Sequence, residues 1–352
     1  MGATAASDLA PLLSVLMRTQ HRRPATLEEA LLSLAAQSCD DFELLLLAHD
    51  VSEDGIRELQ ALVDAYPPSF VDRVRIVPVH GGGRARPLNV GIREAQGRYI
   101  VILDDDDVAL SHWVAEFQKA AALHPTGVLR GLVAQQEVAP VLWHGTTPGY
   151  DVVGRPRCPW QQTFDVIEHF TENHSHTGGW AVPRHVFRER SLQFDESLPV
   201  LEDWDVLMQA VLTIGVSSID QIIVLVRLWR TGDSSTLLRS DVEWHEARSV
   251  VLARLDADSL ALPPGSATRL HIMGFQAQEA TTRIADLTDE LSAARSELQQ
   301  SEAARRDTEE QLLAERRKIA EIWSSRSWKL SKPLRGVGRL SRRYRRPPPD
   351  GS

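Results

Sequence analysis

Over about its first 130 residues, the chain alternates short apolar runs with helix-like segments, a rhythm that few architectures accommodate. The runs at 12–17, 42–48, 74–79 and 99–103 have the length and composition of buried strands. Helical patterns fill the gaps near 53–65 and 86–96, and another opens at Thr26, where Glu29 predicts a capping box. Together these segments predict βαβ units and an α/β fold, in which helices flank a mostly parallel sheet.

Acidic residues directly follow two of these runs. Asp50 comes after the second run, and four aspartates, Asp104 to Asp107, come after the fourth. Ligands of parallel sheets bind beyond the carboxyl ends of the strands. Four adjacent carboxylates repel one another, and a divalent cation such as Mg²⁺ or Mn²⁺ would relieve that repulsion. The same cation would neutralise a diphosphate leaving group, whereas the alternative is a solvated acidic turn.

The segment from about 131 to 200 has no regular pattern and is rich in Pro, Gly, His and Trp. We expect long ordered loops there, of the kind that often line active sites. His174 and His176 precede a Thr-Gly-Gly-Trp sequence, and their spacing fits either a pair of ligand contacts or ordinary loop histidines. A helix is expected over 202–212 and a strand over 222–228.

Beyond the Pro-Pro-Gly sequence at 263–265, the pattern changes to heptads. This predicts a coiled coil over 275–322 and hence a homo-oligomer, a dimer or a trimer; the alternative is a single charged helix packed on the body. We divide the chain into a flexible N-terminus (1–10), a globular domain (11–262), a hinge (263–274), the coiled coil and a tail (323–352). The heptad a positions are Ala277, Ile284, Leu291, Leu298, Arg305, Leu312 and Ile319.

Positive charge is concentrated near the end of the chain. The whole chain has a net charge of -9, yet residues 323–346 hold nine Lys or Arg and no acid, which leaves about -18 on the rest by subtraction. A basic tail that contains Trp suits an anionic membrane surface, and the alternative is a solvated tail. No nucleic-acid-binding module accompanies the tail, so we expect no nucleic-acid partner.

The two cysteines, Cys39 and Cys158, imply no disulfide framework, so a reducing compartment is expected. The sequence shows neither a signal-peptide pattern nor an apolar run of about 18 residues. We therefore expect a cytoplasmic protein that contacts the inner face of the cell membrane peripherally through its tail.

A set of short motifs, taken in order, resembles the family 2 glycosyltransferases of the GT-A fold. The resemblance covers roughly residues 11–240, and the ordered set is more specific than any single motif. The tail also resembles a short motif that follows coiled coils in bacterial surface-polysaccharide glycosyltransferases. The matching segments are Arg18-Thr19-Gln20, Asp50, Arg84-x-x-x-Leu88-Asn89-x-Gly91, Ala95-x-Gly97-x-Tyr99-Ile100-x-x-Leu103 with the four aspartates, Phe194-Asp195-Glu196 and Glu202-Asp203-Trp204.

The resemblance implies a role for each matching residue. Asp104 and Asp106 match the D-x-D motif, which binds Mn²⁺ or Mg²⁺ and the donor diphosphate, and Asp105 lies within it. Four consecutive acids leave the exact register of this motif open, at Asp105 and Asp107 above all. Asp203 matches the catalytic base, which takes the proton of an acceptor hydroxyl as that oxygen attacks the anomeric carbon; the neighbouring Glu202 would support it. One such base implies a single displacement, with inversion at that carbon. Further donor contacts are assigned to Thr19, Asp50, Arg84, Asn89 and Arg230, and acceptor contacts to Trp204 and His176.

The chain departs from the family pattern after the first strand. Met17-Arg18-Thr19-Gln20 replaces the usual Pro-x-Tyr-Asn and removes an aromatic that often stacks on the nucleotide base, so the nucleotide and the sugar stay open. We expect a metal-dependent inverting transferase that moves a sugar from a nucleotide-diphosphate donor to a glycan or lipid-linked acceptor in cell-surface polysaccharide synthesis. One alternative is a non-catalytic scaffold organised by the coiled coil. Another is a nucleotidyltransferase, whose Gly-rich, Lys-containing phosphate loop residues 18–23 do not supply.

Overall fold

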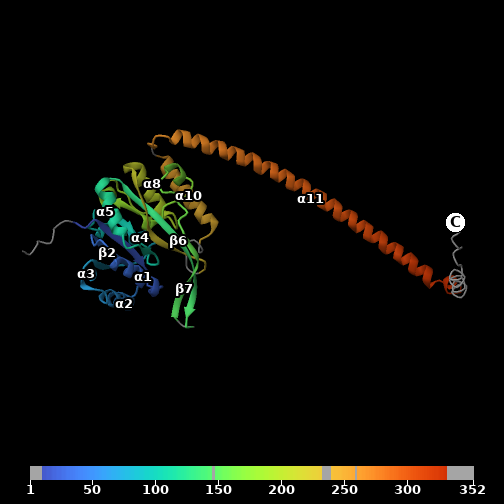
Figure 1. Cartoon of the computed structure of the whole chain (residues 1–352), viewed down its shortest axis with the longest axis horizontal. Helices are drawn as coiled ribbons and strands as arrows, with labels where there is room; N and C mark the ends of the chain where they lie inside the picture. Colours follow the sequence, from blue (N-terminus) through green and yellow to red (C-terminus); the bar gives the residue numbers. More distant parts are fainter. Residues whose placement is uncertain (1–9, 145–146, 232–238, 258–259, 331–352) are drawn as a thin grey trace, which may run out of the picture. The chain divides into compact units, whose positions relative to one another are not determined.

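The computed structural model of the protein describes residues 10–144, 147–231, 239–257 and 260–330. The chain divides into two compact units, Met1–Ala267 and Thr268–Ser352 (Figure 1). Residues 1–9 of the expected flexible N-terminus and residues 331–352 of the basic tail lie outside the described residues.

The first four strands of the globular unit form the parallel half of its sheet, in the order β3-β2-β1-β4. They correspond closely to the four predicted apolar runs, so the predicted βαβ rhythm is confirmed. The strands are β1 (Leu13–Thr19), β2 (Phe42–His49), β3 (Val74–Val79) and β4 (Tyr99–Ile102). The helices between them are α1 (Pro24–Ala35), α2 (Glu53–Asp64), α3 (Pro68–Val71) and α4 (Ala85–Glu94).

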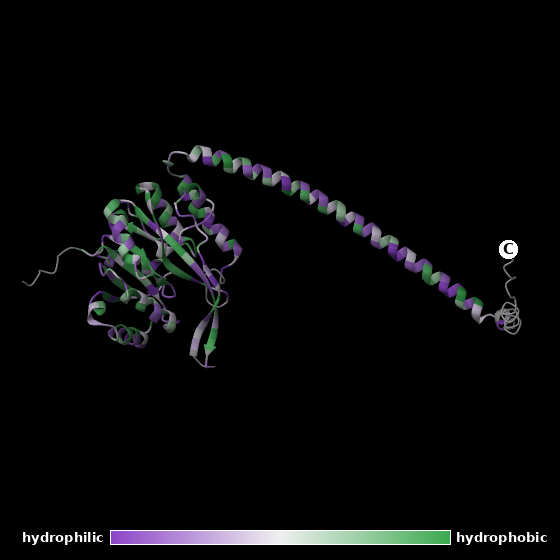
Figure 2. Ribbon diagram, viewed as in Figure 1, coloured by the Kyte–Doolittle hydropathy of each residue, from purple (hydrophilic) through white to green (hydrophobic). Residues whose placement is uncertain are grey.

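Both faces of this parallel half are buried, as helices on both sides require. Every residue of β2 is buried. Because strand side chains alternate between faces, Leu44 packs into a cluster with residues of α1 and α2, whereas Leu45 packs into another with residues of α4. Figure 2 shows the hydrophobic colour along these central strands. The near-continuous apolar runs therefore follow from a sheet covered on both sides.

The start of β4 is fixed by a close approach of the backbone at Gly97. A Cβ at Gly97 would lie 2.5 Å from the backbone nitrogen of Ser14, so only glycine fits. The Glu43 carboxylate accepts hydrogen bonds from the backbone nitrogens of Gln96 and Gly97. These contacts set β4 against β1, and the aspartate run follows directly from β4.

The second half of the sheet is mixed. Its strands are β5 (Val108–Ala109), β6 (Val128–Trp143), β7 (Thr147–Arg157), β8 (Trp180–Pro183) and β9 (Val216–Trp229), and the order continues β4-β8-β6-β9-β5. Strand β6 runs parallel to β9 and antiparallel to β8, and β7 pairs antiparallel with β6. The α/β prediction is confirmed, with antiparallel strands added to the parallel core.

The expectation of irregular loops over 131–200 is wrong for the β6–β7 hairpin, which extends from the sheet (Figure 1). Proline argued against strands there. Pro148 lies in β7, which pairs only with β6 among the described strands, so its missing N–H can face away from the ladder. Pro140 lies beyond Val138, where the pairing of β6 with β9 ends. Both positions tolerate proline because one side of the backbone has no strand partner.

The remaining helices include α8 (Glu202–Ile214), which confirms the helix predicted over 202–212, and β9 contains the predicted strand. The predicted capping box is wrong, because α1 begins at Pro24 and Thr26 lies inside it, where its hydroxyl donates to the carbonyl of Arg23. The other helical elements are α5 (Trp113–Leu123), α6 (Val166–His169), η1 (Thr177–Gly179), α7 (Arg184–Glu189), α10 (Asp241–Asp256), α11 (Ser266–Ser324) and α12 (Arg326–Leu330).

The long C-terminal helix α11 runs unbroken for 59 residues. It begins at Ser266, so most of the segment assigned to the hinge is helical. Hydrophilic and hydrophobic residues alternate along it (Figure 2). Whether it pairs with a second helix stays a prediction. Across the part of the chain that the structure describes, no helix combines the length and the apolar character needed to cross a membrane.

Candidate active site

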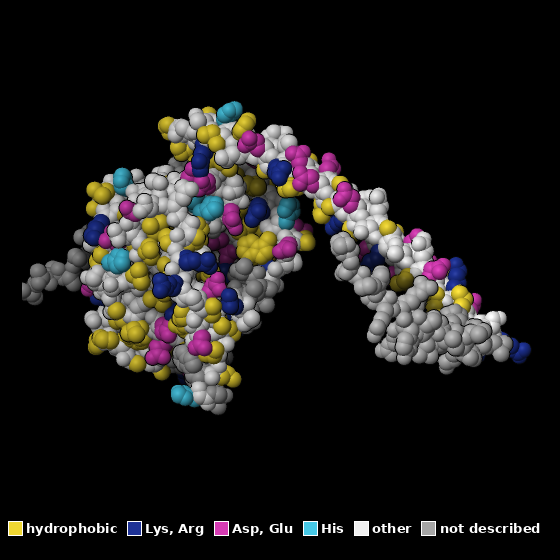
Figure 3. Space-filling view, turned by 45° about the vertical axis from the view of Figure 1, so that its right-hand side comes forward, with side chains coloured by type: hydrophobic (Ala, Val, Ile, Leu, Met, Phe, Trp, Pro, Cys, Tyr) yellow, Lys and Arg dark blue, Asp and Glu magenta, His cyan; other side chains and the backbone are white. Residues whose placement is uncertain are grey.

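A cavity of about 1060 Å³ lies where the carboxyl ends of β1 and β4 meet the first turn of α8. Its walls also include residues 172–177, the end of β9 and part of α10. Figure 3 shows a hollow in the globular unit where acidic, basic, histidine and hydrophobic side chains lie close together. Strand ends therefore supply the site, as parallel sheets predict.

Side chains at the end of β1 and just after it, together with Trp229 of β9, hold three of the four aspartates in place. The Arg18 guanidinium lies 3.3 Å from a carboxylate oxygen of Asp104. Thr19 donates its hydroxyl to Asp105 at 2.5 Å. Asp106 accepts from Arg23 at 2.9 Å and from the indole of Trp229 at 2.7 Å. The crowded acidic run is thus stabilised mainly by cations and donors that the parallel pairing of β1 and β4 brings alongside it.

The two acidic residues that begin α8 lie in different electrostatic environments. Glu202 is buried and accepts from both Arg18 and Arg84 at 3.1 Å. Burial opposes its ionisation, but the charges of Arg18 and Arg84 outweigh that effect and lower the pKa of Glu202. Asp203 accepts from the side chain of Asn173 at 3.3 Å. Burial and then the charge of Glu202 raise the pKa of Asp203 to about 6, so this carboxyl can gain and lose a proton near neutral pH.

The backbone conformation of Leu201 sets the direction in which α8, and with it Glu202 and Asp203, begins. Its backbone is left-handed, with φ of 65° and ψ of 15°, immediately before the first turn of α8. A non-glycine residue in this region costs roughly 1–3 kcal/mol, which the surrounding packing must offset. Glu202 and Asp203 then lie in the first helical turn, where the helix dipole favours carboxylates.

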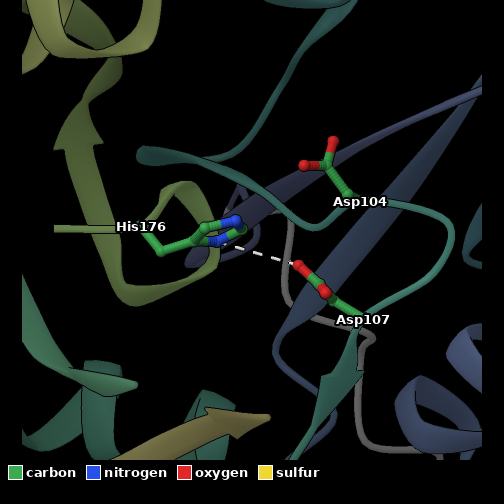
Figure 4. A group of neighbouring side chains, drawn as sticks. All are labelled: Asp104, Asp107 and His176. Carbon is green, nitrogen blue, oxygen red and sulfur yellow. Dashed lines mark ion pairs between the residues drawn. The ribbon is translucent and has the colours of Figure 1, made fainter. Parts of the chain in front are cut away.

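Asp104, Asp107 and His176 form a cluster that fits a divalent cation. Each offers one ligand atom, and these atoms lie within 4.8 Å of one another. The ring of His176 points toward Asp107, with 3.7 Å between its Nδ1 and Oδ2 of Asp107 (Figure 4). Among the described residues, Oδ2 of buried Asp107 has no hydrogen-bond partner. Buried polar atoms normally find partners, so this orphaned oxygen favours a bound cation.

The protonation of the cluster agrees with this fit. Burial, followed by the charges of Asp106 and Asp104, raises the pKa of Asp107 well above its ordinary value. Burial lowers the pKa of His176, which keeps the imidazole neutral, as a metal ligand must be. A bound cation would supply the positive charge that these crowded carboxylates lack.

This cluster differs from the predicted ligand pair, because it contains Asp104 and Asp107 and leaves Asp106 out. A turn explains the change: the backbone nitrogen of Asp107 donates to the carbonyl of Asp104 at 3.1 Å. This turn brings Asp107 back beside Asp104. The carboxylate of Asp106 instead faces Arg23 and Trp229. Asp107 also accepts from the backbone nitrogen of Arg227 at 3.1 Å, which fixes its orientation.

Three predicted donor contacts lie outside the cavity walls. Asp50, with φ of 53°, accepts from the backbone nitrogen of Gly81 at 2.7 Å. Asn89 is buried and exchanges hydrogen bonds of 2.9 Å with the backbone of Phe194. Arg230 pairs with Glu137 of β6 at 3.0 Å, and the following residues 232–234 of its loop lie outside the described residues. Asp50 and Asn89 hold backbone segments in place and Arg230 pairs with a strand, so the donor contacts of these three residues stay predictions.

The other predicted residues border the cavity. They include Arg84 and Thr19 on the donor side, His176, and Trp204. Trp204, however, is fully buried and donates its indole N–H to the carbonyl of His169. Its side chain therefore holds α8 against residues near 169 and offers no exposed surface to an acceptor.

Sequence analysis missed the site roles of Arg227 and Trp229 at the end of β9. Arg227 is buried and bonds to Glu29, to the hydroxyl of Tyr150 and to the carbonyl of Asp106. Side chains two residues apart share a strand face, so the alternation of 227 and 229 was an available signal. Arg230, the cation chosen from the sequence, lies just beyond the strand end, and its contact with the donor stays a prediction.

Comparisons with known proteins agree with this fold. The family described as "Glycosyl transferase family 2" matches residues 14–190, just over half of the chain. An uncharacterized glycosyltransferase of Methanocaldococcus jannaschii is 28% identical over 100 residues, which cover 28% of this chain and 33% of that protein. The chain thus spans about a third of the length of the curated relative it matches.

Two solved structures share the architecture. The S. aureus TarS 1–349 structure in complex with UDP-GlcNAc has a TM-score of 0.55 and 17% identity, covering 71% of this chain and 68% of that chain. The mannosyltransferase PcManGT from Pyrobaculum calidifontis, in complex with GDP-Man and Mn²⁺, has a TM-score of 0.51 and 15% identity, covering 73% and 68%. At these identities the likeness concerns the fold, and it confirms the predicted GT-A class.

Proposed function

The chain belongs to glycosyl transferase family 2, and we propose that it transfers a sugar from a nucleotide-diphosphate donor to a hydroxyl of a glycan or lipid-linked acceptor. The observation that carries the proposal is the placement of two chemistries in one cavity. The Asp104–Asp107–His176 cluster fits a divalent cation, and Asp203 is a carboxyl whose pKa lies near neutrality. A donor diphosphate needs the first, and an attacking hydroxyl needs the second.

At the donor end, Asp104, Asp107 and His176 would hold Mn²⁺ or Mg²⁺. When bound, the cation neutralises the oxygens of the departing diphosphate. Arg84 lines the cavity with 38% of its side chain exposed, so its remaining N–H groups can reach an anionic ligand. Thr19 and Asp105, which bond to each other, form the neighbouring wall and remain proposed donor contacts.

At the acceptor end, Asp203 accepts the proton of the acceptor hydroxyl. The acceptor oxygen forms a bond to the anomeric carbon while the bond from that carbon to the diphosphate breaks. A single displacement of this kind inverts the anomeric carbon. Glu202 stays ionised between Arg18 and Arg84, and its negative charge helps to keep the pKa of Asp203 high. General-base catalysis of this type contributes roughly 10²–10⁴-fold.

The nucleotide and the sugar stay open within this proposal. The two similar structures carry different donors, UDP-GlcNAc and GDP-Man, so neither transfers to this chain. We propose cell-surface polysaccharide synthesis as the setting. A cytoplasmic location with peripheral contact at the inner face of the membrane belongs to the same proposal.

A thermal-shift panel tests the proposal directly. UDP, GDP, dTDP and CDP sugars are added to the full chain with and without Mn²⁺, and we expect one donor class to raise the melting temperature only when Mn²⁺ is present. Asp203→Asn serves as the matched variant, because it should keep this shift and lose transfer. If no donor shifts the folded protein, the scaffold alternative replaces the enzyme.

A further inference from the structure

Helix α10 supplies a wall of the cavity to which neither the motifs nor the cation cluster assigns a role. Trp244 and Arg248 of this helix border the cavity. They lie on one helix face with Val251 and Leu255, at spacings of four, three and four residues. Val251 and Leu255 are buried in the body, whereas Trp244 and Arg248 are only partly covered. This face of α10 therefore packs against the globular unit near the C-terminal end of the helix and borders the cavity near its N-terminal end.

Arg254 of α10 forms two ion pairs, and one of them attaches α10 to α8, the helix that begins with Glu202 and Asp203. Arg254 pairs with Asp205 of α8 and with Asp195, the latter at 2.5 Å. Asp205 lies two residues after Asp203, so the helix that carries Trp244 and Arg248 is fixed to the helix that carries the proposed base. A capping box between Ser240 and Glu243 defines the start of α10.

Arg248 is the unusual cation of this cavity. Its Nε atom is buried and has no hydrogen-bond partner among the described residues. Arg248 also forms no ion pair with any of these residues. The other buried or half-buried arginines of the walls, Arg18, Arg23, Arg84 and Arg227, are each paired with a carboxylate. A buried guanidinium N–H without a partner costs free energy, so a ligand that supplies an acceptor there gains that energy back.

We propose that Trp244 and Arg248 form a subsite for an acceptor that carries an anionic group, a phosphate or a carboxylate, near its reacting hydroxyl. The inference rests on the proposed function. The donor diphosphate already has the cation cluster and Arg84, whereas α10 is fixed to the helix that bears Asp203, which must face the acceptor. The planar guanidinium of Arg248 pairs with two anionic oxygens at once, and the indole of Trp244 offers a flat apolar surface to a sugar ring.

Calorimetric titration of the full chain tests this subsite with three probes: glucose, glucose 6-phosphate and glucuronate. The solution contains Mn²⁺ and the nucleotide diphosphate that gives the largest thermal shift, so that the donor side is filled. We expect at least one anionic probe to bind roughly tenfold or more tightly than glucose, the gain of a charge-assisted pair. The tighter of the two anionic probes distinguishes phosphate from carboxylate.

Variants assign the preference to its residue. Arg248→Met should remove the preference for the anionic probe, and Arg248→Lys should restore part of it. Trp244→Leu should weaken all three probes alike. Arg22→Met is the matched control, because Arg22 is an exposed arginine of the same cavity and should leave the preference intact. The nucleotide shift in each variant confirms that the fold and the donor side are preserved.

The outcomes separate this inference from the proposed function. Equal binding of glucose and both anionic probes, absence of binding by both anionic probes, or an anion preference that survives Arg248→Met would each overturn the subsite. If the preference for the anionic probe disappears in Arg22→Met and not in Arg248→Met, the anionic group binds near Arg22, and the assignment to Arg248 is overturned. Absence of any nucleotide shift would refute the donor site, and the titration is then run without nucleotide, where the same criteria apply to the subsite.

Discussion

Two adjacent carboxylates at the start of α8, Glu202 and Asp203, have different protonation behaviour, and nearby arginines account for much of the difference. Arg18 and Arg84 both contact Glu202, so its pKa falls and it remains an anion. Asp203 accepts a hydrogen bond from the side-chain amide of Asn173, and burial, followed by the neighbouring charge of Glu202, raises its pKa. A residue with a pKa near the working pH is the better base, and the pairing pattern therefore selects Asp203.

The pH dependence of Asp203 provides the first prediction. Transfer should increase as pH rises through about 6 and then level off, because the base acts only when deprotonated. Its pKa in the folded chain lies above its ordinary value of 3.8, so the unfolded chain loses this proton first. Ionisation of Asp203 therefore lowers the free energy of unfolding progressively between about pH 4 and pH 6, and this loss reaches its full size above about pH 6.

Asp203→Asn should consequently abolish transfer and raise the melting temperature at about pH 8, with the gain vanishing below about pH 4. Rate profiles and melting curves over this range measure both effects. A variant that is inactive but equally stable at all pH values would show that the raised pKa is not a property of this carboxyl.

The aspartate run provides the second prediction. Asp107→Asn and His176→Gln should each raise the Mn²⁺ concentration needed for the donor-induced thermal shift by roughly tenfold or more. Asp106→Asn should have a smaller effect, because its carboxylate faces Arg23 and Trp229. If Asp106→Asn weakens the Mn²⁺ response more than Asp107→Asn does, the ligands are those of the predicted D-x-D pair.

Local patterns predicted much of the site, and long-range pairing decided the rest. Asp104 and Asp203 were identified because each follows a recognisable element boundary, a strand end or a helix start. The exchange of Asp106 for Asp107 depends on a four-residue turn, which an unbroken run of identical residues cannot reveal. Arg227 lies within β9 and borders the cavity, whereas Arg230 lies beyond the strand end, so their placement depends on where β9 ends beside β6.

At the level of elements, Arg227 joins three segments that are far apart in sequence. It connects β9 to Glu29 of α1, to Tyr150 of β7 and to the carbonyl of Asp106. Its guanidinium also lies 4.8 Å from the ring centre of Tyr150. The β6–β7 hairpin, which sequence patterns missed, thus reaches the loop that bears the acidic cluster through one arginine.

This connection yields the third prediction. Arg227→Met leaves Glu29 and Tyr150 without their cation, so the loop at 104–107 should lose its position and the Mn²⁺ requirement of transfer should rise several-fold or more. Arg227→Lys keeps the charge but lacks the planar fork and should restore only part of the effect. Tyr150→Phe, which removes one hydroxyl, should cost less. The apparent KM for Mn²⁺ and kcat are measured together, and a fall in kcat at constant KM for Mn²⁺ would contradict a positioning role.

At the scale of the whole molecule, the two units differ in whether the apolar residues of their sequence patterns are buried. In the globular unit the apolar residues face inward, and the strand pattern could be interpreted because the runs of β1, β2 and β4 are buried on both faces, whereas the edge strand β3 is only partly covered. In α11 the apolar heptad residues are exposed: Ile284 by 65%, Leu291 by 52% and Leu298 by 60%. The heptads predicted the helix, but they do not reveal the partner, since a repeat of this kind specifies a stripe and any matching stripe can cover it.

Pairing of α11 with a second copy of the chain is the fourth prediction. The double change Leu291→Glu and Leu298→Glu puts two charges into the heptad a positions, whereas Ser292→Glu and Gln299→Glu puts the same number one position later, outside the seam. Sedimentation velocity should show an oligomer for the wild type and for the second variant, and a monomer for the first. The donor-induced thermal shift should persist in all three, because the cavity lies within the globular unit. A wild type that sediments as a monomer at every concentration would leave α11 a single charged helix, and two variants that dissociate alike would refute a seam at the heptad a positions.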